Sequence, residues 1–155
     1  MGIAVRHWSH VFIQASDMDA SLAFYRDLFD AAVWTDERIE DAEFGEMIGG
    51  PGATARIVNL VIGGQKVELI SVTGLPTAPV PSRAARGLAG FCFRVEDLDE
   101  AYRTCVDRGL QPEAEPTEIH GFRQFVIQDP DGVRIELSQP PAGLEVEGPF
   151  SGSEA

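Results

Sequence analysis

A stretch near the start of the chain returns at residue 90, and this repeat restricts the fold more than any other feature of the sequence. Residues 10–20 align with residues 90–100, so that Asp17 meets Asp97 and Asp19 meets Asp99. A second repeated motif ends each half, where Glu68 and Glu136 each stand between aliphatic residues. Two motifs repeated in the same order predict a duplicated unit of one strand, one helix and three strands. The period is too long, and the copies are too few, for a solenoid.

Each copy begins with a short alternating strand that leads into a helix. Val11 and Ile13 are apolar and are expected to pack beneath that helix. The opposite face of this first strand carries His10, Phe12 and Gln14. Ser16 or Asp17 can accept hydrogen bonds from the free amides of the first helical turn. The sequence therefore predicts a helix laid on one face of a sheet, with a histidine on the other face.

The predicted organisation is one domain over residues 1–138. Its first module covers residues 8–71, a proline-containing linker covers residues 72–89, and its second module covers residues 90–138. We expect residues 39–54 to form a glycine-rich mobile loop and residues 110–117 to form an edge strand. Residues 139–155 are expected to form a disordered acidic tail.

The composition excludes several classes of function. A net charge of −13 on 155 residues argues against nucleic acid as a partner, because such a surface repels phosphates. No apolar run approaches the roughly 20 residues that a membrane span needs, so we expect a cytoplasmic protein without a membrane partner. The two cysteines, Cys92 and Cys105, fall in predicted strand and helix and are expected to be reduced thiols.

Strand alternation places one imidazole and two carboxylates on the side opposite the helices. These side chains are His10, Glu68 and Glu136, and they converge if the two modules form one curved sheet. One imidazole with two carboxylates suits a hard or borderline divalent ion. The alternative is that both glutamates are solvated on an open sheet face and that His10 is an ordinary polar residue. Arg94, on the same side, offers another alternative, because it can pair with a glutamate in place of a metal.

Several motifs resemble those of the vicinal oxygen chelate superfamily, and the resemblance covers residues 8–138. The motifs are the strand and helix from His10 to Leu28, Val67-Glu68-Leu69, Phe93 to Asp99, and Asp129-Pro-Asp-Gly132 with the strand through Glu136. That superfamily includes glyoxalase I, methylmalonyl-CoA epimerase, extradiol dioxygenases, fosfomycin-resistance enzymes and bleomycin-binding proteins. The resemblance implies an α+β fold of two βαβββ modules that form a curved, cleft-enclosing mixed sheet, with helices on the outer face.

The resemblance also implies a metal site, with one departure. The four ligand positions of the metal-binding members match His10, Glu68, position 90 and Glu136, and position 90 here is Gly90 rather than histidine. Extradiol dioxygenases hold iron with two histidines and one glutamate, so the loss of the second histidine argues against that chemistry. A site of one histidine and two glutamates is expected to bind its ion, whether Ni, Co, Zn, Mn or Fe, more weakly.

Three functions follow from these residues. The first is a lyase or isomerase of the glyoxalase or epimerase type, in which a metal binds vicinal oxygens and Glu68 or Glu136 acts as the base. The second is a metal-free binding protein of the bleomycin-resistance type, and the third is a metal-free enzyme of secondary metabolism. In each case the partner is a small molecule and a homodimer is expected. The remaining residues predicted to line the cleft are Phe12, Gln14, Ile70, Cys92, Arg94 and Arg134.

Overall fold

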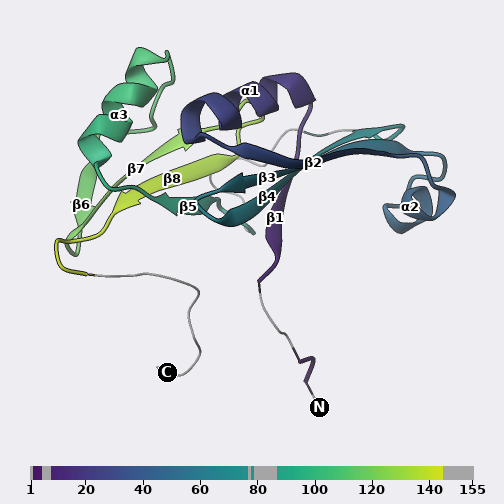
Figure 1. The fold of residues 1–155 in the computed structure, drawn as a ribbon, viewed down its shortest axis with the longest axis horizontal. Coiled ribbons are helices and arrows are strands. Elements are labelled where there is room, and N and C mark those ends of the chain that lie inside the picture. Colours follow the sequence, from purple (N-terminus) through teal and green to yellow (C-terminus); the bar gives the residue numbers. More distant parts are fainter. Residues whose placement is uncertain (1, 5–7, 77, 79–86, 145–155) are drawn as a thin grey trace. The chain divides into compact units, whose positions relative to one another are not determined.

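The computed structural model describes residues 2–4, 8–76, 78 and 87–144, and the chain divides into two compact units (Figure 1). The first unit comprises Met1–Ala89 and Gln128–Val133, and the second comprises Gly90–Ile127 and Arg134–Ala155. The strands form two four-stranded mixed sheets. The predicted α+β fold class is confirmed.

The two modules repeat one topology. The first module runs through β1 (His10–Gln14), α1 (Met18–Phe29), β2 (Ala32–Ile39), α2 (Ala42–Met47), β3 (Thr54–Ile62) and β4 (Gln65–Thr73). The second module runs through β5 (Phe91–Arg94), α3 (Leu98–Asp107), β6 (Thr117–Ile119), β7 (Phe122–Gln128) and β8 (Arg134–Gln139). The sheet orders are β1-β4-β3-β2 and β5-β8-β7-β6, and in each sheet the first strand pairs in parallel with the last.

The repeated aspartates cap the two main helices in the same way. Asp17 precedes α1 with φ −129° and ψ 104°, and its side chain accepts from the amides of Asp19 and Ala20. Asp97 precedes α3 with φ −127° and ψ 104°, and its side chain accepts from the amide of Glu100. The two caps satisfy amides that have no partner within the helix and fix where each helix begins.

Each sheet buries the face that the alternation predicted. In the first unit Ile13, Val67 and Leu69 are buried, and α1 covers one face of the sheet that carries them (Figure 1). In the second unit Ile135 and Leu137 are buried on the α3 side. Complete burial of an aliphatic side chain of this size is worth about 1.5–3 kcal/mol. The opposite face of each sheet is therefore the one that is available for a ligand.

The turn between β7 and β8 belongs to the first unit. Asp129 accepts a hydrogen bond from the Tyr25 hydroxyl at 2.9 Å, and both side chains are buried. Asp131 accepts from the Ser16 amide with both carboxylate oxygens, each at 3.1 Å. Gly132, with φ 84°, supplies the left-handed conformation that this tight turn requires. These bonds fix the turn against the start and the middle of α1.

Two sequence predictions about local structure are wrong. Residues 42–47, predicted as part of a loop, form α2, since Ala, Glu and Met favour a helix before the Gly49-Gly50-Pro51-Gly52 stretch ends it. Residues 110–116 form no strand, and the edge strand β6 begins only at Thr117. Pro112 and Pro116 lack the amide hydrogen that a ladder needs, and the Glu113 amide donates a backbone hydrogen bond from this segment to β7, at the Val126 carbonyl.

Parts of the predicted linker and tail, residues 77, 79–86 and 145–155, lie outside the described residues. Among the helices of the described chain, none is both long enough and apolar enough to cross a membrane.

Candidate functional site

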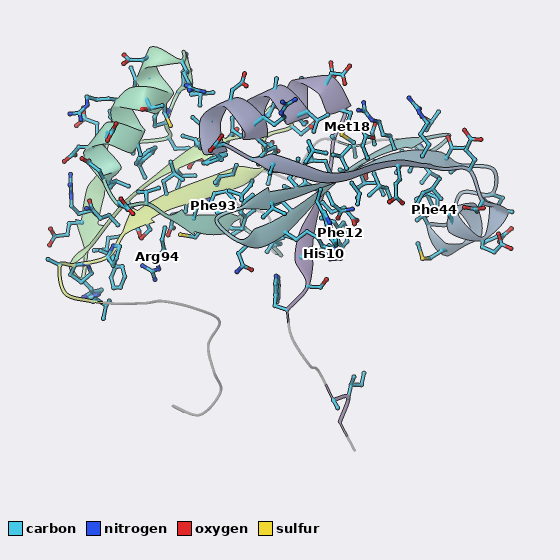
Figure 2. The ribbon with its side chains drawn as sticks, in the orientation of Figure 1. His10, Phe12, Met18, Phe44, Phe93 and Arg94 are labelled. Carbon is cyan, nitrogen blue, oxygen red and sulfur yellow. The ribbon has the colours of Figure 1, made fainter. Side chains whose placement is uncertain are left out.

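His10 and Glu68 lie together on the open face of the first sheet. His10 Nε2 is 3.9 Å from Glu68 Oε2, and the two side chains are 28% and 19% exposed. The parallel β1–β4 pair sets this contact, because Glu68 stands opposite Phe12 and therefore one pleat along from His10. Figure 2 shows His10 and Phe12 together on β1.

A hydrogen bond at Nδ1 orients the imidazole of His10. Nδ1 is 2.8 Å from the Ser9 hydroxyl, which leaves Nε2 toward the Glu68 carboxylate. A hydrogen bond at one ring nitrogen commonly orients a metal-binding histidine. Among the described residues no lysine or arginine forms an ion pair with Glu68. In donor chemistry, this nitrogen and carboxylate fit part of a divalent-metal site.

Two polar residues on this face were missed by the sequence analysis. Asn59 on β3 is the register partner of Glu68, and Thr35 on β2 is the register partner of Asn59. The Asn59 amide donates to the Thr35 hydroxyl at 2.8 Å, and its Oδ1 is buried without a hydrogen-bond partner among the described residues. An asparagine between aliphatic residues in the β3 sequence was the available signal. Two of the predicted cleft residues, Gln14 and Ile70, are register partners two residues further along β1 and β4 than Phe12 and Glu68.

Exposed aromatic side chains accompany the polar residues. Phe12 is 70% exposed and Trp34, at a bulge in β2, is 66% exposed. The Lys66 ammonium lies 5.6 Å from the centre of the Trp34 ring. Phe12 is therefore available for stacking with a ligand, and Lys66 contacts an aromatic ring while none of the described acidic side chains forms an ion pair with it.

The open face of the second sheet carries Glu136, Cys92 and Arg94. Cys92 and Glu136 are register partners on β5 and β8. Although Cys92 is an exposed residue, packing around its sulfur, the hydrogen bond to Glu136 and the charge of that carboxylate raise the pKa of Cys92 to about 12. The thiol is therefore protonated at neutral pH rather than a thiolate ligand, and it donates a hydrogen bond to the Phe93 carbonyl oxygen at 3.6 Å.

The two arginines of this face have different partners. Arg134 donates to both carboxylate oxygens of Glu113, each at 2.8 Å, and this pairing raises the pKa of Arg134. The Arg94 guanidinium lies over the Phe122 ring at 5.3 Å from its centre. No acidic side chain within the described ranges forms an ion pair with Arg94, so the predicted alternative of an Arg94–glutamate pair is not found there.

Gly90 has a conformation that excludes a side chain. Its φ is 151°, and a Cβ atom added to it would lie 2.5 Å from the carbonyl oxygen of Arg134. No real Cβ atom approaches a backbone oxygen so closely. A histidine cannot occupy this position without movement of the backbone, which gives a physical reason why the second imidazole is missing.

The predicted metal ligands are divided between the two units. His10 and Glu68 belong to the first unit and Glu136 to the second. Among the residues that the structure describes, no group of three or more His, Cys, Asp or Glu side chains is arranged to hold a metal ion. The three-residue site therefore stays a prediction, and the His10–Glu68 contact is the part of it that lies within one unit.

Comparison with known proteins identifies the family. The sequence profile of the Glyoxalase/Bleomycin resistance protein/Dioxygenase superfamily matches residues 7–137. The chain belongs to this superfamily. The resemblance to the vicinal oxygen chelate proteins is thereby confirmed. No curated protein sequence matches the chain significantly.

Solved structures of the superfamily share the fold. A glyoxalase family protein from Bacillus cereus superposes with a TM-score of 0.80 at 20% identity, over 90% of this chain and 97% of that chain. A glyoxalase family protein from Enterococcus faecalis superposes with a TM-score of 0.67 at 24% identity, over 86% and 97%. The fosfomycin resistance protein FosX from Listeria monocytogenes, solved with Mn(II) and sulfate, gives 0.62 at 16% identity, over 90% and 96%.

Proposed function

We propose that this member of the glyoxalase superfamily is a lyase or isomerase that acts on a small molecule with vicinal oxygens. His10, Glu68 and Glu136 would hold a divalent ion, and one of the two glutamates would act as the base. The observation that carries the proposal is the contact of 3.9 Å between His10 Nε2 and Glu68 Oε2 on an open sheet face. A structural relative, FosX, was solved with Mn(II), which supports a divalent ion in this fold.

The ion, when bound, would polarise a carbonyl or hydroxyl oxygen of the substrate and so acidify the neighbouring C–H bond. The remaining work belongs to the chain. Glu68 or Glu136 would take the proton from that carbon and return it to the same or another atom, which gives isomerisation, or support elimination. Cys92, the register partner of Glu136, would stand beside that carboxylate as a protonated thiol.

The donor set also bears on which ion is bound. With glycine at position 90, one nitrogen and two carboxylates are available, and the remaining positions would be filled by water or substrate. Such a set suits Ni, Co, Zn, Mn or Fe, at lower affinity than a set with two histidines.

The proposal extends to the organisation of the protein. We propose one domain over residues 1–138 followed by an acidic tail, a homodimer, and a cytoplasmic location. Support for the dimer is general, since two-fold symmetric dimers are by far the commonest assemblies of soluble oligomeric proteins.

A second candidate function is the binding of a flat or cationic ligand without catalysis. Two observations favour it. Gly90 cannot carry a fourth metal ligand, and Phe12 and Trp34 are largely exposed residues, Phe12 on the face that also carries Glu68 and Trp34 against Lys66 of β4. Aromatic side chains beside a carboxylate are suited to a flat cation.

Metal analysis of protein purified without chelator tests the proposal. We expect about one divalent ion per chain in the wild type, lost in His10→Ala and retained in His120→Asn. His120 is exposed in the turn between β6 and β7 with φ 51°, a conformation that asparagine tolerates, so this variant removes an imidazole outside the site. Wild-type protein that holds no metal after incubation with each of the five ions would contradict the enzyme proposal and leave ligand binding as the better candidate.

A further inference from the structure

Arg94 lies over an aromatic ring, whereas three other arginines are hydrogen-bonded to carboxylates. Arg56 is bonded to Asp36 and Asp19, Arg123 to Asp99, and Arg134 to Glu113. Arg94 instead lies over the Phe122 ring and, in the described part of the chain, has no carboxylate partner. Its guanidinium is therefore in contact with an aromatic ring and not in an ion pair with any of the described acidic side chains.

Arg94 lies on the same face of the second sheet as the proposed base Glu136. Arg94 is at the end of β5, on the side of the sheet away from α3, as Figure 2 shows. Cys92 precedes it on the same face, and Cys92 is the register partner of Glu136. Two residues along a strand span about 6.6 Å. Arg94 therefore stands about one pleat from the carboxylate that we propose as a base.

The ring beneath Arg94 favours the binding of an anion. A guanidinium stacked on an aromatic face keeps the N–H donors of its own plane free, and these donors match the two oxygens of a carboxylate or a phosphate. Stacking on Phe122 also orders a long side chain before the ligand arrives, which reduces the entropy that binding must overcome. An arginine held by a carboxylate, such as Arg134, has already used these donors.

We propose that Arg94 binds an anionic group of the substrate, a carboxylate or a phosphate, while Glu136 acts on a carbon about one pleat away. The inference rests on the proposed role of Glu136, and it adds a substrate class: a small anionic molecule whose acidic group lies roughly 7 Å from the reacting carbon. The excess negative charge of the protein repels anions in general. Arg94 would overcome this repulsion locally and would thereby select molecules with a group of the right shape.

The test uses the metal-free protein and two simple anions, malonate and inorganic phosphate. Each is titrated at constant ionic strength while the NMR signal of the Arg94 Nε–H group is followed. We expect a saturable shift, with the anion that binds more tightly indicating whether a carboxylate or a phosphate is preferred. Arg94→Gln should weaken binding by roughly 10-fold or more, because a charge-assisted hydrogen bond is lost, and Arg94→Lys should weaken it less. Binding by the variants is followed through backbone amide signals of β5.

Two further variants make the comparison specific. Arg103→Gln changes the net charge by the same amount at an exposed position on α3 and should leave binding unchanged. Phe122→Leu should weaken binding by a few-fold while Arg94 remains, because the guanidinium is no longer ordered by a ring. An equal loss of anion affinity in Arg94→Gln and Arg103→Gln would mean a general charge effect and would overturn the proposal. The absence of saturable anion binding in the wild type would overturn it as well.

The outcome is separable from that of the metal analysis. Arg94→Gln protein should retain the same divalent metal content as the wild type, since Arg94 is not among the proposed ligands. Anion binding without metal binding would support the Arg94 site and contradict the proposed metal-dependent enzyme. Metal binding without anion binding would support the metal site and contradict the proposed role of Arg94.

Discussion

Tyr25 on α1 donates its hydroxyl hydrogen to Asp129 Oδ2 across 2.9 Å, and both side chains are buried. The two residues are separated by most of the chain, and Asp129 belongs to the turn before the strand that carries Glu136. The backbone amides of Asp131 and Val133 donate to the other carboxylate oxygen of Asp129. One carboxylate thus shapes the turn and attaches it to the helix of the first module.

Removal of the Tyr25 hydroxyl tests this attachment. Tyr25→Phe should lower the free energy of unfolding by about 1.5–3 kcal/mol, because a buried carboxylate oxygen loses its donor. Tyr102→Phe is the matched control. Tyr102 lies on α3, its ring packs edge-on against Phe125, and its hydroxyl has no hydrogen-bond partner among the described residues. Urea denaturation of the two variants measures the difference, and equal effects would contradict a specific role for the Tyr25–Asp129 bond.

The contribution of the buried Asp129 to the free energy of unfolding should depend on pH. Burial raises the pKa of the Asp129 carboxyl, although the bonds from Val133, Tyr25 and Asp131 act in the opposite direction. Because the folded protein holds the proton more tightly than the unfolded chain, the stabilisation is complete below the unfolded pKa and is lost as the pH rises through the folded pKa.

Asp129→Asn removes this titration. The free energy of unfolding of the wild type relative to Asp129→Asn should therefore fall as the pH is raised from about 4 toward neutrality. Urea denaturation of both proteins at several pH values measures this difference. A difference that rises with pH in this range would mean that the three hydrogen bonds lower the pKa of Asp129 by more than burial raises it, and would contradict the prediction.

The repeat explains why much of the fold could be predicted. Asp17 and Asp97 are local signals, since a cap acts on amides two or three residues away, and their equal backbone angles follow from equal local sequences. Strand alternation is local as well, and it correctly assigned Val67 and Leu69 to the buried face.

Other features depend on partners that no local pattern reveals. The Tyr25–Asp129 bond joins residues distant in sequence. Asn59 gains its importance only because β3 sets it opposite Glu68, a register that turn chemistry alone does not fix. The conformation of Gly90 arises from the close approach of the β8 backbone. The sequence thus predicted the candidate ligands, whereas their surroundings required the structure.

Cys92 provides a chemical probe of Glu136. Since the pKa of Cys92 is raised to about 12, the thiol should react slowly with iodoacetamide at pH 8 despite its exposure. Glu136→Gln removes a negative charge beside the sulfur, so the pKa of Cys92 should fall and the rate of alkylation should rise several-fold. Mass spectrometry of time points gives the rate, with Cys105→Ser as the background to exclude the second thiol.

The control for this experiment is Glu100→Gln, which removes an equal charge at an exposed position in the first turn of α3. This change should leave the rate of Cys92 alkylation unaltered. An equal acceleration in both variants would show a general charge effect rather than a Cys92–Glu136 interaction.

Replacement of Gly90 tests whether the missing second imidazole is a matter of backbone geometry. Gly90→Ala should destabilise the protein by about 1–3 kcal/mol through the unfavourable φ alone, and further through contact with the Arg134 carbonyl. Gly63→Ala is the control, because Gly63 has φ 53° but nothing within 4 Å of its added Cβ, so it should cost only about 1–2 kcal/mol. Gly90→His should be at least as unstable as Gly90→Ala and should bind no more metal than the wild type. Urea denaturation and metal analysis measure both effects. Tighter metal binding by Gly90→His at unchanged stability would show that the backbone accepts a fourth ligand, and that the glycine alone limits the affinity of the proposed site.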